Sequence, residues 1–137
     1  MFEKILVAID HSDHSQHALS AAKDLAKASG GAVRVVHVRE MSIGKPGPVP
    51  KEDTDAAQAL VDDAVKTLAG EGISATGTVH DSHTGRVAAV IIDEAGESGS
   101  SVIVLGSRGL TDLEGLVMGS TTHKVLHLGS LPVLVVR

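Results

Sequence analysis

Residues 101–121 read SVIVLGSRGLTDLEGLVMGST, and this stretch decides the fold. It opens with an apolar, β-branched run over 101–105, which is typical of a strand buried on both faces. Gly106 and Gly109 follow the run directly, and Gly119 and Ser120 stand where a helix should begin. A buried strand that leads through glycines into a helix indicates an α/β fold.

The same alternation of short apolar runs and amphipathic stretches fills the rest of the chain. It predicts strands at 4–9, 32–38, 73–80, 101–105 and 133–136, and helices at 13–29, 53–70, 87–95 and 120–129. Strands that alternate with helices imply parallel pairing through right-handed crossovers. We therefore expect an α/β fold in which residues 1–137 form a single domain. Its core would be a doubly wound, five-stranded parallel sheet with about four helices, a Rossmann-like three-layer sandwich.

Two local signals refine this outline. The spacing from Asp13 to Gln16 suits a capping box at the start of the first helix. The segment 40–52 is rich in glycine and proline and is longer than the usual connection in an α/β unit. We interpret it as a loop that could act as a lid or a binding loop.

Composition excludes several classes of function. Phe2 is the only aromatic residue of the 137, so no aromatic platform for stacking bases is available. The net charge of -5 and the scattered Lys and Arg residues leave no basic stripe, so we expect no nucleic-acid partner. No apolar run approaches the roughly 20 residues of a membrane span, and the start lacks a secretory signal. We expect a cytoplasmic protein without membrane contact.

The glycine-rich segment has the parts of an anion-binding site. A helix that begins near Ser120 offers unpaired N–H groups, and a glycine beside them lets a phosphate approach. The segment matches neither the Walker pattern nor the G-x-G-x-x-G dinucleotide pattern, which indicates a different nucleotide site. In doubly wound sheets, ligands bind at the carboxyl ends of strands near the point where strand order reverses. Asp10, Val38 and Gly106 occupy such ends.

These glycines also carry a resemblance. Gly106, Gly109, Gly119 and Ser120 match the ATP-binding signature of the universal stress protein family: glycine, two residues, glycine, nine residues, glycine, then serine or threonine. KILVAIDHSDHSQHAL resembles the family's first strand and helix, VLGSRG its fourth strand and turn, and LPVLVVR its closing strand. The resemblance covers nearly the whole chain and implies an ATP-binding regulatory or stress-response protein that acts as a nucleotide-dependent switch.

The resemblance also implies where the nucleotide binds. It places the adenine base near Asp10 and Val38, and the ribose and phosphates along the glycine-rich segment, where Arg108 could neutralise phosphate charge. The nucleotide-binding residues implied are Ala8, Asp10, Val38, Gly106, Ser107, Arg108, Gly109, Gly119, Ser120 and Thr121. Mg²⁺ or Mn²⁺ would accompany ATP, held mainly by phosphate oxygens and water, so no side chain is assigned as a metal ligand. A homodimer through the strand 133–136 is a further implication.

Other interpretations stay open. The chain could be a slow ATP-hydrolysing enzyme on the same fold, although no G-x-S-x-G elbow surrounds Ser12 or Ser120 and no water-activating base can be named. It could also be a scaffold that holds partners without nucleotide. The histidines suggest a metal site, with His11, His14 and His17 recurring every three residues and His123 and His127 able to share a helix face. Surface histidines without cysteine explain this pattern equally well, so we predict no protein-held metal.

Overall fold

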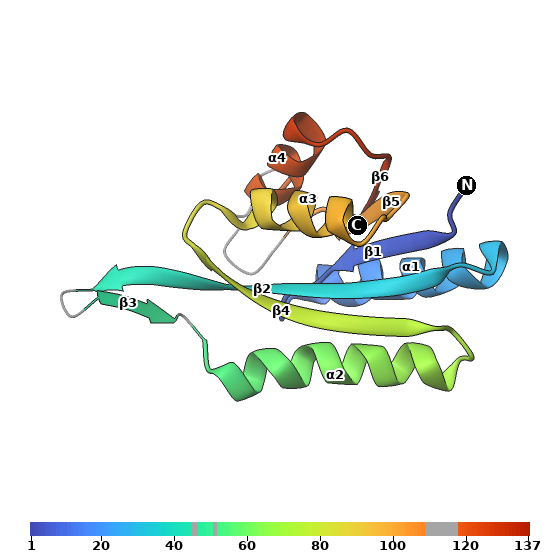
Figure 1. Cartoon of the computed structure of the whole chain (residues 1–137), viewed down its shortest axis with the longest axis horizontal. Helices are drawn as coiled ribbons and strands as arrows, with labels where there is room; N and C mark the ends of the chain where they lie inside the picture. Colours follow the sequence, from blue (N-terminus) through green and yellow to red (C-terminus); the bar gives the residue numbers. More distant parts are fainter. Residues whose placement is uncertain (45–46, 51, 109–117) are drawn as a thin grey trace.

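A sheet of six strands forms the centre of the molecule (Figure 1). The computed structural model describes residues 1–44, 47–50, 52–108 and 118–137. The parallel strands are β1 (Lys4–Ala8), β2 (Ala32–Gly44), β4 (Ala75–His83), β5 (Val102–Gly106) and β6 (Val133–Val136). They lie in the order β4-β2-β1-β5-β6, and the order reverses between β1 and β5. The predicted doubly wound parallel sheet is confirmed, with one antiparallel strand in addition.

Helices cover both faces of this sheet (Figure 1). The helices are α1 (Asp13–Ser29), α2 (Thr54–Gly70), α3 (Val87–Glu97) and α4 (Ser120–Leu128). Ile5 and Val7 of β1 pack with residues of α1 and α2, whereas Leu6 and Ala8 pack with residues of α3 and α4. Each of these four side chains is buried, which is why the run reads as continuously apolar. The hydrophobic effect on both faces therefore sets the three layers.

The prediction of a loop over 40–52 is wrong. The strand β2 continues to Gly44, and β3 (Gly47–Pro50) pairs with it antiparallel, so that Ser42 lies opposite Val49. This hairpin projects beyond the sheet in Figure 1. The prolines that indicated a loop, Pro48 and Pro50, alternate along β3, so both missing N–H groups lie on one edge. A short edge strand tolerates prolines in that arrangement.

Two predicted boundaries also change. The strand expected at 73–80 runs from Ala75 to His83, because the longer β2 offers a pairing partner as far as the pair Met41 and His83. The first helix is capped by Ser12, whose Oγ accepts a hydrogen bond from the Ser15 N–H at 3.3 Å, and not by Asp13. Asp13 lies in the first turn of the helix, where a negative charge is favourable.

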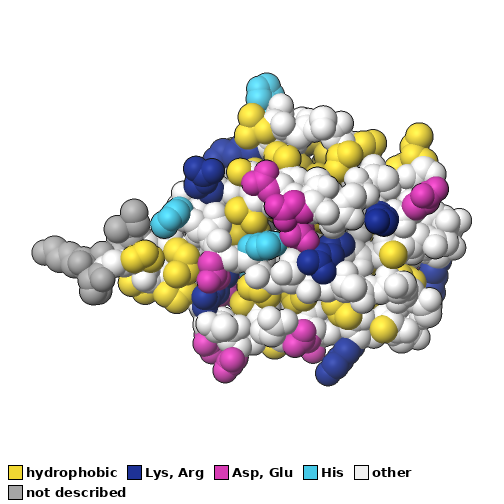
Figure 2. Space-filling model, viewed as in Figure 1, with side chains coloured by type: hydrophobic (Ala, Val, Ile, Leu, Met, Phe, Trp, Pro, Cys, Tyr) yellow, Lys and Arg dark blue, Asp and Glu magenta, His cyan; other side chains and the backbone are white. Residues whose placement is uncertain are grey.

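The outer surface carries mixed charge. On the face drawn in Figure 2, basic and acidic side chains are interspersed, and no large area of one sign is visible. Among the residues that the structure describes, no helix has both the length and the apolar character needed to cross a membrane.

Gly106 is required where β5 passes under α1. A Cβ atom at this position would lie 2.9 Å from His14 Cβ and 3.0 Å from the His14 carbonyl carbon and oxygen. Because two of these atoms belong to helix backbone, the helix would have to move to make room. The close packing of α1 on β5 therefore explains this glycine, whatever binds nearby.

The substitution Gly106→Ala tests this packing. We expect it to lower the free energy of unfolding by about 1–3 kcal/mol, since overpacking forces neighbouring backbone to shift. Urea denaturation followed by circular dichroism measures the change. Gly96→Ala is the matched control, because a Cβ there meets no described atom within 4 Å apart from its chain neighbours and its own helix backbone. Alanine within a helix should leave stability unchanged or raise it by up to about 1 kcal/mol. Equal stability of Gly106→Ala and the wild type would contradict the packing argument.

A buried carboxylate connects α3 to two strands. The side chain of Glu94 on α3 is 7% exposed; its Oε1 accepts from Arg34 Nε at 2.8 Å, and its Oε2 lies 2.8 Å from His80 Nε2. Burial alone raises the pKa of Glu94, but the hydrogen bonds and charges of Arg34 and His80 outweigh it and hold the pKa below its usual range. Glu94 therefore remains ionised inside the fold.

Glu94→Gln keeps the shape of the side chain and removes its charge. We expect a loss of about 2 kcal/mol in unfolding free energy near neutral pH, the scale of hydrogen bonds to charged groups. Because the folded pKa is lowered, the contribution of Glu94 is complete above its unfolded value near 4.5 and is lost as the pH falls through the folded value. The stabilities of variant and wild type should converge in acid. The exposed Glu97, also on α3, supplies the control Glu97→Gln, for which no difference at any pH is expected; a constant gap for Glu94→Gln down to acid pH would refute the assignment.

Candidate functional site

A cleft opens at the carboxyl ends of β1 and β5, where the strand order reverses, and extends along the middle of β2. Many of the residues predicted to bind nucleotide line it: Ala8, Asp10, Val38, Gly106, Arg108, Ser120 and Thr121. Ala8, Val38 and Gly106 lie on β1, β2 and β5, and Asp10 follows β1. Ser120 and Thr121 begin α4. The topology thus collects residues from both ends of the chain at one edge of the sheet.

The remaining predicted residues do not line the cleft or lie outside the described residues. Ser107 is buried, and its N–H donates to the Val136 carbonyl at 2.7 Å. Its own carbonyl accepts from the Gly119 N–H at 2.6 Å, so these two residues join the end of β5 to the start of α4. Gly109 lies outside the described residues. Ser107 and Gly119 therefore hold in place the residues at the start of α4 that line the cleft.

The start of α4 forms the polar wall of the cleft. Gly119 is the N-cap residue, and the first turn places Ser120, Thr121 and Thr122 at the cleft. Thr122 Oγ1 donates to the Gly106 carbonyl at 2.7 Å, which holds this turn against the end of β5. A helix N-terminus carries partial positive charge, and Arg108 adds a full charge beside it. This wall suits an anion such as a phosphate group.

Asp10 is held in one orientation. Its Oδ1 accepts from the Ser12 N–H at 2.8 Å and from Ser15 Oγ at 2.8 Å, while its own N–H donates to Ser15 Oγ at 2.7 Å. The turn between β1 and α1 therefore presents the carboxylate at the cleft. Sequence reasoning found Asp10 but missed Ser15, although a serine in the first helical turn after a strand-ending aspartate is a recognisable turn signal.

Part of the lining is apolar. Val36 and Val38 come from β2, and Val87 and Ile91 come from α3. A wall of this kind can accept the flat face of a heterocyclic ring. In the sequence, Val87 and Ile91 were recognisable only as the buried face of a helix, because nothing local indicates which strand end that helix covers. Glu40 also lines the cleft and was missed, since it fell in the segment predicted as a loop.

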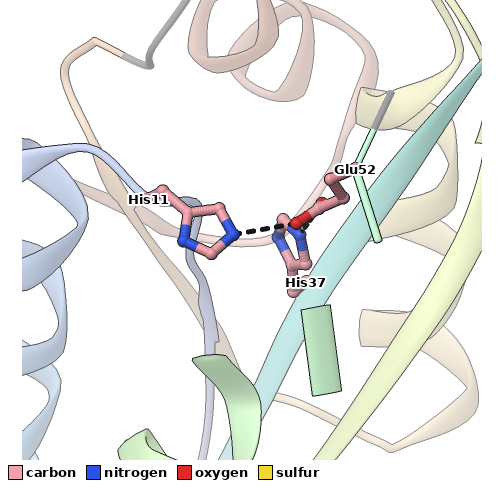
Figure 3. Close-up of side chains that lie close together, drawn as sticks. All are labelled: His11, His37 and Glu52. Atoms are coloured by element: carbon pink, nitrogen blue, oxygen red, sulfur yellow. Dashed lines mark hydrogen bonds and ion pairs between the residues drawn. The ribbon is translucent and has the colours of Figure 1, made fainter. Parts of the chain in front are cut away.

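His11, His37 and Glu52 form a cluster, and His37 is also among the residues that line the cleft (Figure 3). His11 Nε2 lies 2.8 Å from Glu52 Oε2, and His37 Nε2 contacts Glu52 Oε1. Burial alone raises the pKa of Glu52, but hydrogen bonds from His11 and His37 outweigh it and hold the pKa below its usual range. We call these three residues the His–Glu cluster.

The His–Glu cluster differs from the grouping that the sequence suggested. His14 and His17 lie beside each other on α1, with ring centroids 6.3 Å apart, but His11 turns away from them toward β2. Its ring meets that of His37 edge to face at 5.7 Å. His37 and Glu52 were missed because their approach depends on how β2 and the start of α2 are placed in space.

Comparison with known proteins agrees with this architecture. Residues 1–137 match the model of the universal stress protein family. Universal stress protein YxiE of Bacillus subtilis is 35% identical over 151 residues, covering all of both chains. A solved universal stress protein family structure from Burkholderia pseudomallei has 28% identity and a TM-score of 0.77, over 98% of this chain and 95% of that one. The universal stress protein from Archaeoglobus fulgidus in complex with dAMP has 25% identity and a TM-score of 0.75, over 100% of both chains.

The match to the family spans every residue, and a relative above 30% identity aligns along its full length. The fold superposes on solved family members with TM-scores of 0.77 and 0.75. This chain therefore belongs to the universal stress protein family.

Proposed function

We propose that this protein binds an adenine nucleotide, ATP, in the cleft at the carboxyl ends of β1 and β5, and acts as a nucleotide-dependent switch in a stress response. The observation that carries the proposal is that one cleft joins an apolar wall to a helix N-terminus and an arginine, at the point where the strand order reverses. The Archaeoglobus fulgidus relative in complex with dAMP supports an adenine nucleotide as the ligand class.

The two walls assign the parts of the nucleotide. The adenine ring would lie against Val38 and Ile91, whose apolar side chains would replace the water around the ring. The phosphates would lie at the first turn of α4, where Ser120 and Thr121 offer hydroxyl groups. Arg108 would neutralise part of the phosphate charge.

A divalent cation fits the acidic side of the same cleft. Asp10 and Glu40 both line it, and two carboxylates near a triphosphate are unfavourable unless a cation lies between them. Mg²⁺ or Mn²⁺, held mainly by phosphate oxygens and water, would remove that repulsion. ATP binding should then weaken when the cation is chelated.

Arg108→Ala distinguishes phosphate recognition from base recognition. Wild-type protein, refolded to remove carried-over ligand, is titrated with ATP, ADP, AMP, cyclic AMP and GTP, with and without Mg²⁺, while thermal unfolding is followed. At 100 times its Kd, a ligand stabilises the native state by about 2.7 kcal/mol. We expect Arg108→Ala to weaken ATP binding about tenfold, equivalent to about 1.4 kcal/mol, and AMP binding less.

Lys66→Ala is the matched control, because Lys66 is an exposed cation of α2 that is not part of the cleft lining. An unchanged melting temperature with every nucleotide up to millimolar concentration would refute the proposal and favour a scaffold that binds only protein partners. Steady release of ADP in the same samples would favour the slow ATP-hydrolysing enzyme.

The switch would act through the hairpin and through a homodimer. Since β2 carries Val38 and Glu40 into the cleft and then continues into the hairpin, nucleotide should slow hydrogen exchange at residues 40–44 and 47–50. We also propose that β6 forms the dimer surface, because Leu134 is 40% exposed on a strand whose pairing within the described residues is with β5. The dimer Kd, measured by sedimentation, should change with saturating ATP and Mg²⁺. Identical exchange rates and an identical dimer Kd in both states would rule out the switch.

A further inference from the structure

The His–Glu cluster brings together side chains from three separate parts of the chain. His11 follows β1, His37 lies on β2, and Glu52 lies between β3 and α2. One ligand atom from each residue lies within 4.8 Å of the other two. In Figure 3 both imidazole rings are turned toward the same carboxylate. Once the protons shared between each Nε2 and Glu52 are released, all three atoms offer lone pairs to the space between them, which is the geometry of a shared ligand.

A hydrogen bond to the backbone just after β1 sets the orientation of the His37 ring. Its Nδ1 lies 2.8 Å from the Ile9 carbonyl oxygen, which can only accept, so Nδ1 carries a proton and donates it. This directs Nε2 toward His11 and Glu52. A histidine that binds a metal typically donates its other ring N–H to a backbone carbonyl or carboxylate in this way, which fixes both tautomer and ring plane.

Access to the cluster is graded. The His37 side chain is 5% exposed, whereas those of Glu52 and His11 are 21% and 41% exposed. An ion could therefore enter from the solvent side by a small movement of His11 and settle against a ligand that is already fixed. The ordinary ligand distance of about 2.0 Å to nitrogen or oxygen requires only a modest contraction of the cluster.

We propose that His11 Nε2, His37 Nε2 and the Glu52 carboxylate form a binding site for one transition-metal cation of the Zn²⁺ type. Two imidazoles and one carboxylate favour zinc over Mg²⁺, which prefers oxygen ligands. Three protein ligands leave a fourth position for water or for an anionic oxygen. The site does not depend on nucleotide and is separate from any cation that accompanies phosphates.

The ion would tie the chain together at a particular place. Glu52 lies between the hairpin and α2, and it is 41 residues from His11 and 15 from His37 in sequence. A metal bound to all three would hold the start of α2 against β2 and the β1–α1 turn. Because the ion would bind the native state and not the unfolded chain, it would also raise the melting temperature.

Metal binding to the full chain tests the site. After treatment with chelator, wild-type protein is titrated with Zn²⁺ in competition with a chromogenic chelator, in the absence of nucleotide, and in parallel with Co²⁺ to record its absorption spectrum. We expect one tight equivalent per chain and the intense bands of four-coordinate Co²⁺. His11→Ala and Glu52→Gln should each weaken Zn²⁺ binding by at least about tenfold. A loss of that size is typical even when the mutated residue only hydrogen-bonds to a metal ligand.

The other histidines provide the matched control. His123 and His127 stack on α4 with ring centroids 6.0 Å apart and could hold a metal with two ligands. The double variant His123→Ala with His127→Ala should keep the tight equivalent and the Co²⁺ spectrum. Wild-type affinity in both His11→Ala and Glu52→Gln, or loss of the tight equivalent in the α4 variant alone, would overturn the proposal. Because His11 is exposed, its variant should fold, and a melting curve without metal verifies this.

Discussion

The parallel pairing of β1 with β5 is the constraint on which the rest of the structure depends. Ile5 lies beside Val102 and Val7 beside Val104, although they are far apart in the chain. From this central pair the chain leaves in opposite directions, through α1 on one face and through α4 on the other. The two strand ends therefore stay uncovered between the helices, and this leaves the cleft at their carboxyl ends.

Close packing then determines the shape of the cleft. The end of β5 lies so near α1 that only glycine fits at position 106. A hydrogen bond from Thr122 to the Gly106 carbonyl holds the first turn of α4 against the same strand end. Asp10 is oriented by Ser12 and Ser15 in the turn that follows β1. The polar groups of the cleft are thus placed by hydrogen bonds within a rigid framework, which is the arrangement expected of a preformed binding site.

Polar contacts between distant segments organise the region around the cleft. Arg39 on β2 forms a two-point contact with Asp81 on β4, at 2.7 and 2.9 Å, and also donates to Thr54 at the start of α2. The His–Glu cluster adds a contact between the start of α2, β2 and the β1–α1 turn. Both sets of contacts hold β2, through charged side chains, to Glu52 just before α2 and to Thr54 at its start.

The sequence by itself determined the kind of fold and the family, because burial on two faces, helical periodicity and glycine spacing are local properties of the chain. It also indicated that Asp10, Val38, Gly106 and the start of α4 come together at one cleft, since a doubly wound order brings strand ends together, although β2 does not end at Val38. Other features were decided only by the tertiary structure: the antiparallel pairing of residues 41–44 with 47–50, the entry of Ser15, Glu40, Val87 and Ile91 into the cleft, and the meeting of His11, His37 and Glu52. Proline and glycine do not reveal whether a partner strand is present, and periodicity does not show which helix covers which strand end. Those contacts follow from strand register and helix placement, which bring together residues that no local pattern connects.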